Sequence, residues 1–155
     1  MSGQIERRYL DYSTDQLFEL VADVEKYPEF MPWILSCRIV TRQEDVVWVD
    51  MVLGIGALQQ RFGSWAVLDR PHSIDITSND GPFDSFHQRW QFSSDEQGLA
   101  VVAYSYDFIL RSHVLELISA AVLDQAVRTA VDAFEQRARK VYGTRPVPST
   151  GPIDV

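Results

Sequence analysis

The chain has 155 residues, of which 46% are apolar, and this is enough for one domain with a hydrophobic core. Its formal net charge of −8 argues against a nucleic-acid binder, because such proteins carry a basic surface for the phosphate backbone. The single cysteine, Cys37, excludes an internal disulfide and a multi-cysteine metal site. The sequence shows no signal peptide and no apolar stretch of membrane-spanning length, so we expect a cytoplasmic protein.

The N-terminal part of the chain predicts a strand followed by two short helices. Residues Gln4–Leu10 alternate in polarity, as a strand with one buried face does. Ser13 and Gln16 have the spacing of a capping box, which predicts the start of a helix. A second short helix follows, and Pro28 and Pro32 divide it into single turns.

Residues 34–110 change to an alternating pattern that predicts six further strands joined by short turns. The turns contain polar residues, glycine or proline, as in Asn-Asp-Gly-Pro at 79–82. Successive strands on short turns form an antiparallel meander. The residues predicted to share the inward faces are Leu35, Cys37 and Ile39; Val47, Val49, Met51 and Leu53; Leu58, Gln60, Phe62, Ser64, Ala66 and Leu68; Ile74 and Ile76; Phe86, Trp90 and Phe92; and Val102, Tyr104, Tyr106, Phe108 and Leu110.

The longest segment without glycine or proline, His113–Val141, predicts one amphipathic helix of about seven turns. Ser112 is its candidate N-cap, and Gly143 ends it. We therefore expect an α+β fold in which a seven-stranded curved antiparallel sheet wraps around this helix. The predicted domain covers residues 1–143, and residues 144–155 form a flexible, proline-rich tail. The apolar stripe of the helix comprises Leu115, Ile118, Val122, Ala126, Val127, Ala130, Val131, Phe134 and Ala138.

No motif for catalysis or metal binding stands out. His72, His87 and His113 have no partner at metal-ligand spacing. The carboxylates are scattered, so no pair suggests general acid and base catalysis. Gly54-Ile55-Gly56 lies between two predicted strands, which indicates a turn or bulge and not a phosphate loop. We therefore predict a protein that is not an enzyme and holds no metal or catalytic cofactor.

The unusual feature is the number of large aromatic side chains for one small sheet. Each ring by itself is most simply explained by core packing. Together they could exceed what a sheet and one helix can bury, and this would leave an aromatic-lined cavity between them. Periodicity does not separate a filled core from a pocket, so both interpretations stay open. The rings are Tyr27, Phe30, Trp33, Phe62, Trp65, Phe83, Phe86, Trp90, Tyr104, Tyr106 and Phe108.

Residues 23–33, Asp-Val-Glu-Lys-Tyr-Pro-Glu-Phe-Met-Pro-Trp, resemble the start of the Coq10-like family. The resemblance continues at Gly-Pro-Phe in 81–83, Trp-Gln-Phe in 90–92 and Tyr-Asp-Phe in 106–108, and it covers residues 3–143. The family belongs to the START-type, polyketide-cyclase-like lipid-transfer domains and implies a helix-grip fold with a hydrophobic tunnel. One departure is Ile34, which follows the motif where the family often has cysteine. Residues carried over to the tunnel entrance are Tyr27, Pro28, Phe30, Pro32 and Trp33.

The resemblance implies a quinone chaperone that supports respiration and takes ubiquinone or another polyisoprenoid lipid as its ligand. A tyrosine hydroxyl could then donate to a quinone carbonyl. Peripheral contact with the inner membrane or the respiratory chain would follow, and no direct contact with nucleic acid is expected. Residues predicted to bind the ligand are Tyr27, Pro28, Phe30, Trp33, Phe62, Phe83, Phe86, Trp90, Tyr104, Tyr106, Phe108, Leu115, Ile118 and Val122.

Two alternatives remain open. Bacterial members of the same family include ribosome-associated toxins that block subunit association, and in this alternative RNA would be met through the ribosome. The third interpretation is a cyclase or hydrolase on the same scaffold, since a fold does not determine a function. The missing acid pair and the missing catalytic triad make it the weakest of the three.

Overall fold

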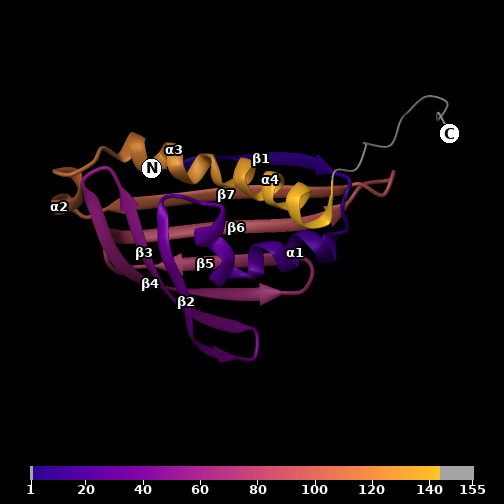
Figure 1. Cartoon of the computed structure of the whole chain (residues 1–155), viewed down its shortest axis with the longest axis horizontal. Helices are drawn as coiled ribbons and strands as arrows, with labels where there is room; N and C mark the ends of the chain where they lie inside the picture. Colours follow the sequence, from indigo (N-terminus) through magenta and orange to yellow (C-terminus); the bar gives the residue numbers. More distant parts are fainter. Residues whose placement is uncertain (1, 144–155) are drawn as a thin grey trace.

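The computed structural model describes residues 2–143, with side chains from residue 7 onward, and the predicted tail at 144–155 lies outside the described residues. One seven-stranded antiparallel sheet has the strand order β1-β7-β6-β5-β4-β3-β2 (Figure 1). The strands are β1 (Ser2–Leu10), β2 (Ile34–Gln43), β3 (Val46–Ile55), β4 (Leu58–Asp69), β5 (Ser73–Ser78), β6 (Phe83–Ser94) and β7 (Ala100–Leu110). The helices are α1 (Thr14–Ala22), the 3-10 helix η1 (Val24–Glu29), α2 (Ser112–Leu115), α3 (Ala120–Arg128) and α4 (Ala130–Tyr142).

The predicted α+β fold and the antiparallel meander are confirmed. Strands β2 to β7 pair in sequence order, and β1 pairs with β7 at the other edge. Helix α1 packs on β5, β6 and α4, while α3 and α4 run along the sheet (Figure 1). The sheet and these helices together enclose one hydrophobic core.

The alternation of apolar residues predicts the inward face correctly in most strands. On β7 all of the predicted residues are buried, from Val102 to Leu110. Strand β2 is the exception, because Leu35 is 49% exposed and Ile34 is buried in its place. The register shifts between Ile34 and Ser36, and this irregularity reverses the parity of the strand at its start.

The predicted N-terminal helices are confirmed. Ser13 Oγ accepts the main-chain N–H of Gln16 at 3.1 Å, and the Gln16 side chain accepts the N–H of Ser13 at 3.0 Å, which is the reciprocal capping box. The second helix is the 3-10 turn η1, with Pro28 inside it. Its buried residue is Tyr27.

The prediction of one continuous helix over His113–Val141 is wrong. Ser119 Oγ accepts the N–H of Val122 at 3.3 Å, so α3 starts with its own cap after a break at 116–119. Thr129 separates α3 from α4, and Ser112 caps nothing, because Arg111 precedes α2. The breaks rotate the predicted stripe, so Leu115 is 52% and Val122 44% exposed.

Candidate ligand cavity

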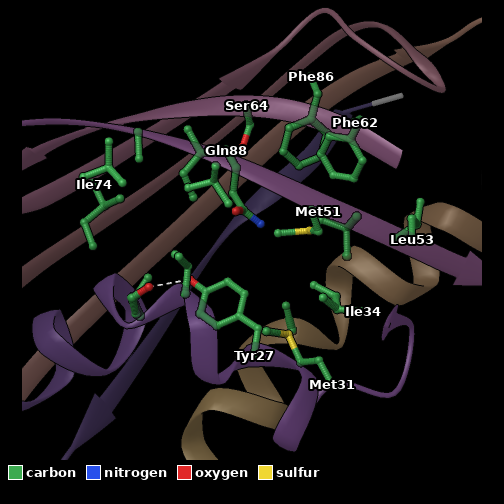
Figure 2. Close-up of a pocket in the computed structure, with 18 of the residues that line it drawn as sticks. Tyr27, Met31, Ile34, Met51, Leu53, Phe62, Ser64, Ile74, Phe86 and Gln88 are labelled. Atoms are coloured by element: carbon green, nitrogen blue, oxygen red, sulfur yellow. Dashed lines mark hydrogen bonds between the residues drawn. The ribbon is translucent and has the colours of Figure 1, made fainter. Parts of the chain in front are cut away.

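A cavity of about 100 Å³ lies between the concave face of the sheet and the helices that cover it (Figure 2). Figure 2 shows Tyr27 and Met31 from the cover opposite Gln88, Ser64 and Phe86 from the sheet. Space of this size accommodates several water molecules or a ring-sized group. Much of the wall is aliphatic, and its residues include Val47, Val49, Leu53, Leu68, Ile74 and Val127.

Some of the residues predicted to bind a ligand line this cavity. They are Tyr27, Trp33, Phe62, Phe83 and Phe86. They come from η1, the segment after it, β4 and β6, so the cavity brings together rings that lie far apart in the sequence. Their contact with a ligand stays a prediction.

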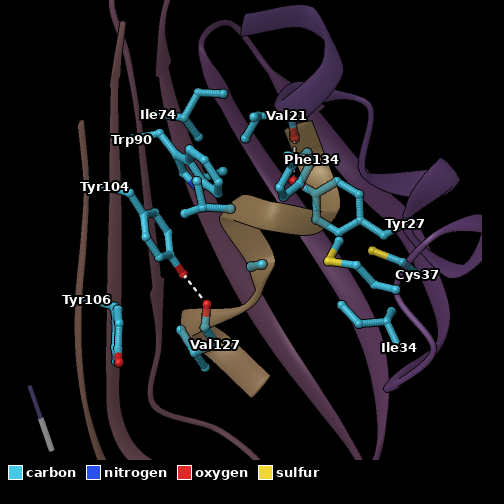
Figure 3. Close-up of a cluster of buried hydrophobic side chains, with 14 of the residues drawn as sticks. Val21, Tyr27, Ile34, Cys37, Ile74, Trp90, Tyr104, Tyr106, Val127 and Phe134 are labelled. Carbon is cyan, nitrogen blue, oxygen red and sulfur yellow. Dashed lines mark hydrogen bonds between the residues drawn. The ribbon is translucent and has the colours of Figure 1, made fainter. Parts of the chain in front are cut away.

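Other predicted residues pack against each other and do not line the cavity. Trp90, Tyr104, Tyr106 and Phe108 form a row along β6 and β7, with ring centroids 4.4 Å, 5.8 Å and 6.3 Å apart in succession. Figure 3 shows the first three of them, Trp90, Tyr104 and Tyr106. These rings fill the core. Trp90 Nε1 is the one buried side-chain nitrogen or oxygen in the described part of the chain that has no hydrogen-bond partner.

The remaining predicted residues also lie away from the cavity wall. Ile118 is buried and faces the turn at Gly56, while Leu115 and Val122 are exposed. Pro28 is half-buried in η1. Phe30 packs on Tyr27 at 5.9 Å.

An aromatic triangle joins η1 to α4 over the cavity. The ring of Phe134 lies 5.2 Å from those of both Tyr27 and Phe30. Arg137 lies over Phe30 at 5.1 Å, and its Nη2 donates to Glu29 Oε1 at 2.9 Å. These contacts hold the η1 part of the cover against the C-terminal helix.

The interior tyrosine hydroxyls donate to the protein itself. Tyr27 donates to the carbonyl of Val21, and burial raises the pKa of Tyr27 well above its usual value. Tyr104 donates to the carbonyl of Val127 at 3.2 Å. A hydrogen bond from a tyrosine to a quinone carbonyl stays a prediction, and it would require one of these two hydroxyls to leave its present acceptor.

Ser64 on β4 and Gln88 on β6 line the mainly apolar cavity, whose wall also includes the phenol of Tyr27 and the indole of Trp33. Gln88 Nε2 donates to the Tyr104 hydroxyl. Among residues 7–143, neither Ser64 Oγ nor Gln88 Oε1 has a hydrogen-bond partner. Neither residue was predicted to line the cavity, although Gln88 carries a signal in the sequence: it is a polar residue at an inward position between Phe86 and Trp90.

A buried carboxylate attaches α3 to the sheet. Asp124 Oδ1 accepts the hydroxyl of Tyr106, and Oδ2 accepts Arg128 Nη2 at 3.1 Å. Burial alone would raise the pKa of Asp124, but the hydrogen bonds from Tyr106 and Arg128 outweigh it and lower the pKa from its usual value. Burial, with the bond to Asp124, also raises the pKa of Tyr106 to about 12.

Replacing Asp124 by alanine is expected to lower the free energy of unfolding by about 2 kcal/mol at pH 7, because the buried Tyr106 hydroxyl loses its acceptor. The pKa of Asp124 is lower in the folded protein than in the unfolded chain. The stabilisation by its carboxylate is therefore complete above the unfolded-state pKa, and it is lost as the pH falls through the folded-state pKa. Urea denaturation should therefore show the difference from wild type shrinking below about pH 4.

The matched control is Asp132→Ala on α4, whose side chain is 54% exposed and pairs with Arg8. Such a surface pair contributes at most about 1 kcal/mol. A difference between Asp124→Ala and wild type that does not change with pH would contradict the assignment to this carboxylate.

The other candidate groups occupy ordinary positions. Cys37 is buried, and burial, with the nearby Glu25, raises the pKa of its thiol to about 12, so it is not an activated nucleophile. His87 contacts Asp75 at 3.3 Å between neighbouring strands. Residues 2–143 contain no group of three or more His, Cys, Asp or Glu that could hold a metal. None of their helices is long and apolar enough to cross a membrane.

A curved seven-stranded antiparallel sheet over a C-terminal helix, with an apolar cavity between them, defines a START-like helix-grip protein. The chain belongs to the polyketide cyclase / dehydrase and lipid transport family, whose model matches residues 10–135. A START superfamily protein from Mycobacterium smegmatis superposes with a TM-score of 0.75 at 17% identity, over 89% of this chain and 97% of that one. The predicted fold and family are thus confirmed.

Two curated relatives carry different names. One is the ribosome association toxin RatA of Pseudomonas aeruginosa, 33% identical over 144 residues that cover 92% of this chain and 100% of the relative. The other is the mitochondrial coenzyme Q-binding protein COQ10 homolog B of Xenopus laevis, 26% identical over 92% of this chain and 60% of the relative. Neither name is that of an enzyme.

Proposed function

We propose that this protein binds a quinone or a related polyisoprenoid lipid in the cavity and acts as its carrier in support of respiration. The observation that carries the proposal is the composition of the wall, which consists mainly of aliphatic and aromatic side chains. Each methylene that a ligand buries there contributes about 0.8 kcal/mol. Membership of a family described by lipid transport, and a relative named for coenzyme Q, support it.

The size of the cavity limits how the ligand could lie. About 100 Å³ is less than the roughly 300–1,000 Å³ of a pocket for a drug-sized molecule. The head ring fits this closed arrangement, while a long tail requires the cover to move away from the sheet. The cover is made of α1, η1, α3 and α4, which contribute Val21, Tyr27, Leu123 and Phe134 to the wall.

Binding should depend on the free space beside β4. We expect decylubiquinone to bind the wild-type protein with one-to-one stoichiometry, and Ala66→Phe, which fills the cavity from its wall, to lose most of that binding. Organic extraction of the purified protein followed by mass spectrometry should also recover a quinone or polyisoprenoid. The measurement is equilibrium ultrafiltration, with circular dichroism to establish that the variant is folded.

The matched control is Val67→Phe, the next residue of the same strand, which is 44% exposed. It adds the same ring outside the cavity and should bind as wild type does. Protein that is empty on extraction and takes up no decylubiquinone would contradict the proposal.

A second candidate is association with the ribosome, favoured by the 33% identity over the whole length of a relative named as a ribosome association toxin. The net charge of −8 weighs against a broad contact with RNA. Sedimentation with large ribosomal subunits distinguishes ribosome association from quinone binding. If Ala66→Phe co-sediments as well as the wild-type protein does, the ribosome contact lies on a surface other than the cavity.

A further inference from the structure

The contact between Tyr104 and Gln88 determines which atom of the Gln88 amide is available to a ligand. The Tyr104 hydroxyl donates its one proton to the carbonyl of Val127 at 3.2 Å (Figure 3). Toward Gln88 the same oxygen can only accept, so Nε2 of the amide is the donor in that contact. The carbonyl atom Oε1 is left without a partner among residues 7–143, on a side chain that points into the cavity (Figure 2).

The wall therefore presents one acceptor whose orientation is determined by its neighbours. Ser64, the other polar residue there, has a hydroxyl that can either donate or accept and so adapts to the ligand. Tyr27 offers no proton, because its hydroxyl donates to Val21. At Gln88 Oε1 the cavity thus requires a hydrogen-bond donor from the ligand.

The need for a donor distinguishes a ligand with a hydroxyl group from the same ligand with carbonyl oxygens in its place. A hydroxyl group can donate to Gln88 Oε1 and complete its hydrogen bonding. A ligand with carbonyl oxygens alone leaves that acceptor desolvated and unpaired, which is costly in an apolar surrounding. Two carbonyl oxygens facing each other would also repel.

We propose that Gln88, oriented by Tyr104, makes the cavity selective for ligands whose polar end carries a hydroxyl donor, so that a quinol binds more tightly than the corresponding quinone. The choice of quinol and quinone rests on the function proposed above, whereas the preference for a donor rests on the cavity alone. Tyr104 is here a positioning residue, since it acts through Gln88.

The test compares decylubiquinol, reduced with dithionite before addition, and decylubiquinone by equilibrium ultrafiltration under nitrogen. We expect the quinol to bind about tenfold more tightly, which corresponds to about 1.4 kcal/mol. Equal affinities, or tighter binding of the quinone, would overturn the inference while leaving the proposed function intact.

Two variants test the mechanism of selection. Tyr104→Phe removes the hydroxyl that orients the Gln88 amide, so the amide can turn its N–H toward a carbonyl. The ratio of quinol affinity to quinone affinity should then fall toward one, because the quinone binds more tightly. Gln88→Leu removes the acceptor, and the ratio should fall through weaker quinol binding. Gln91→Leu, an exposed residue of the same strand, is the control and should keep the wild-type ratio. A ratio unchanged in both test variants would overturn the inference.

A second pair of probes separates this inference from the proposed function. 4-Pentylphenol has a hydroxyl donor, and 4-pentylanisole replaces it by an ether that only accepts. Preference for the phenol that disappears in Gln88→Leu, together with no binding of either quinone form, would support the inference and refute the quinone function. No binding of any of the four probes would overturn both.

Discussion

Replacing Gly81 by alanine is expected to lower the free energy of unfolding by about 4 kcal/mol. Gly81 has φ +61°, where an L side chain is strained, and a Cβ there would lie 2.5 Å from Phe62 Cβ and 2.6 Å from the carbonyl oxygen of Arg61. These are atoms fixed in β4, so relief requires the backbone of the turn or the strand to move. The strain alone costs about 1–2 kcal/mol, and the displaced backbone supplies the rest.

Gly98 provides the control for this prediction. It also has positive φ, +84°, but a Cβ there would meet nothing within 4 Å. Gly98→Ala should therefore show the conformational cost alone, about 1 kcal/mol. Urea denaturation monitored by circular dichroism measures both variants. Equal losses at the two positions would mean that the close approach to β4 has no energetic effect.

The close approach at Gly81 also matters for the cavity. It places the turn before β6 directly on β4, and the rings of Phe62 and Phe83 then meet at 5.1 Å. Both rings line the cavity. A Gly81→Ala protein that remains folded should therefore bind the ligand more weakly, because one end of the wall is displaced.

The elements of this fold could be predicted where one local rule decides them. The alternation of apolar and polar residues predicted the strands, and the capping-box spacing of Ser13 and Gln16 predicted the start of α1. The breaks in the C-terminal helix were harder, because 116–119 and Thr129 contain no proline or glycine. The one local signal was Ser119, a good N-cap residue inside an apparently continuous pattern. The irregularity that exposes Leu35 depends on pairing with β3 and has no signal in β2 alone.

The cavity was harder to predict than the fold, because free space arises where side chains are small. The large rings were predicted to form the cavity wall, but Trp90, Tyr104, Tyr106 and Phe108 fill their part of the core. The cavity lies where Ser64, Ala66 and Ala130 contribute little volume. Its position depends on which small residues of the sheet and the helices face each other, and this is known only once the register is known.

Replacing Phe134 by alanine is expected to lower the free energy of unfolding by about 4 kcal/mol, since the ring is 6% exposed and central to the core. Its centroid lies 4.9 Å from that of Trp90 and 5.2 Å from those of Tyr27 and Phe30. The variant loses these contacts together, and with them the aromatic attachment of η1 to α4. Val122→Ala, at a residue that is 44% exposed, is the control and should change stability by less than about 0.5 kcal/mol.

The same substitution has a consequence for binding, because Phe134 is also part of the cavity wall. Removing the ring enlarges the cavity, so decylubiquinone should bind Phe134→Ala more tightly than it binds the wild-type protein and should recover part of the lost stability. Thermal denaturation with decylubiquinone present and absent measures this recovery. A ligand-induced rise in melting temperature that is larger in Phe134→Ala than in wild type would show that cavity volume limits binding. A smaller rise would mean that the attachment of η1 to α4 is the stronger requirement, because a cover that is no longer held in place cannot enclose the ligand.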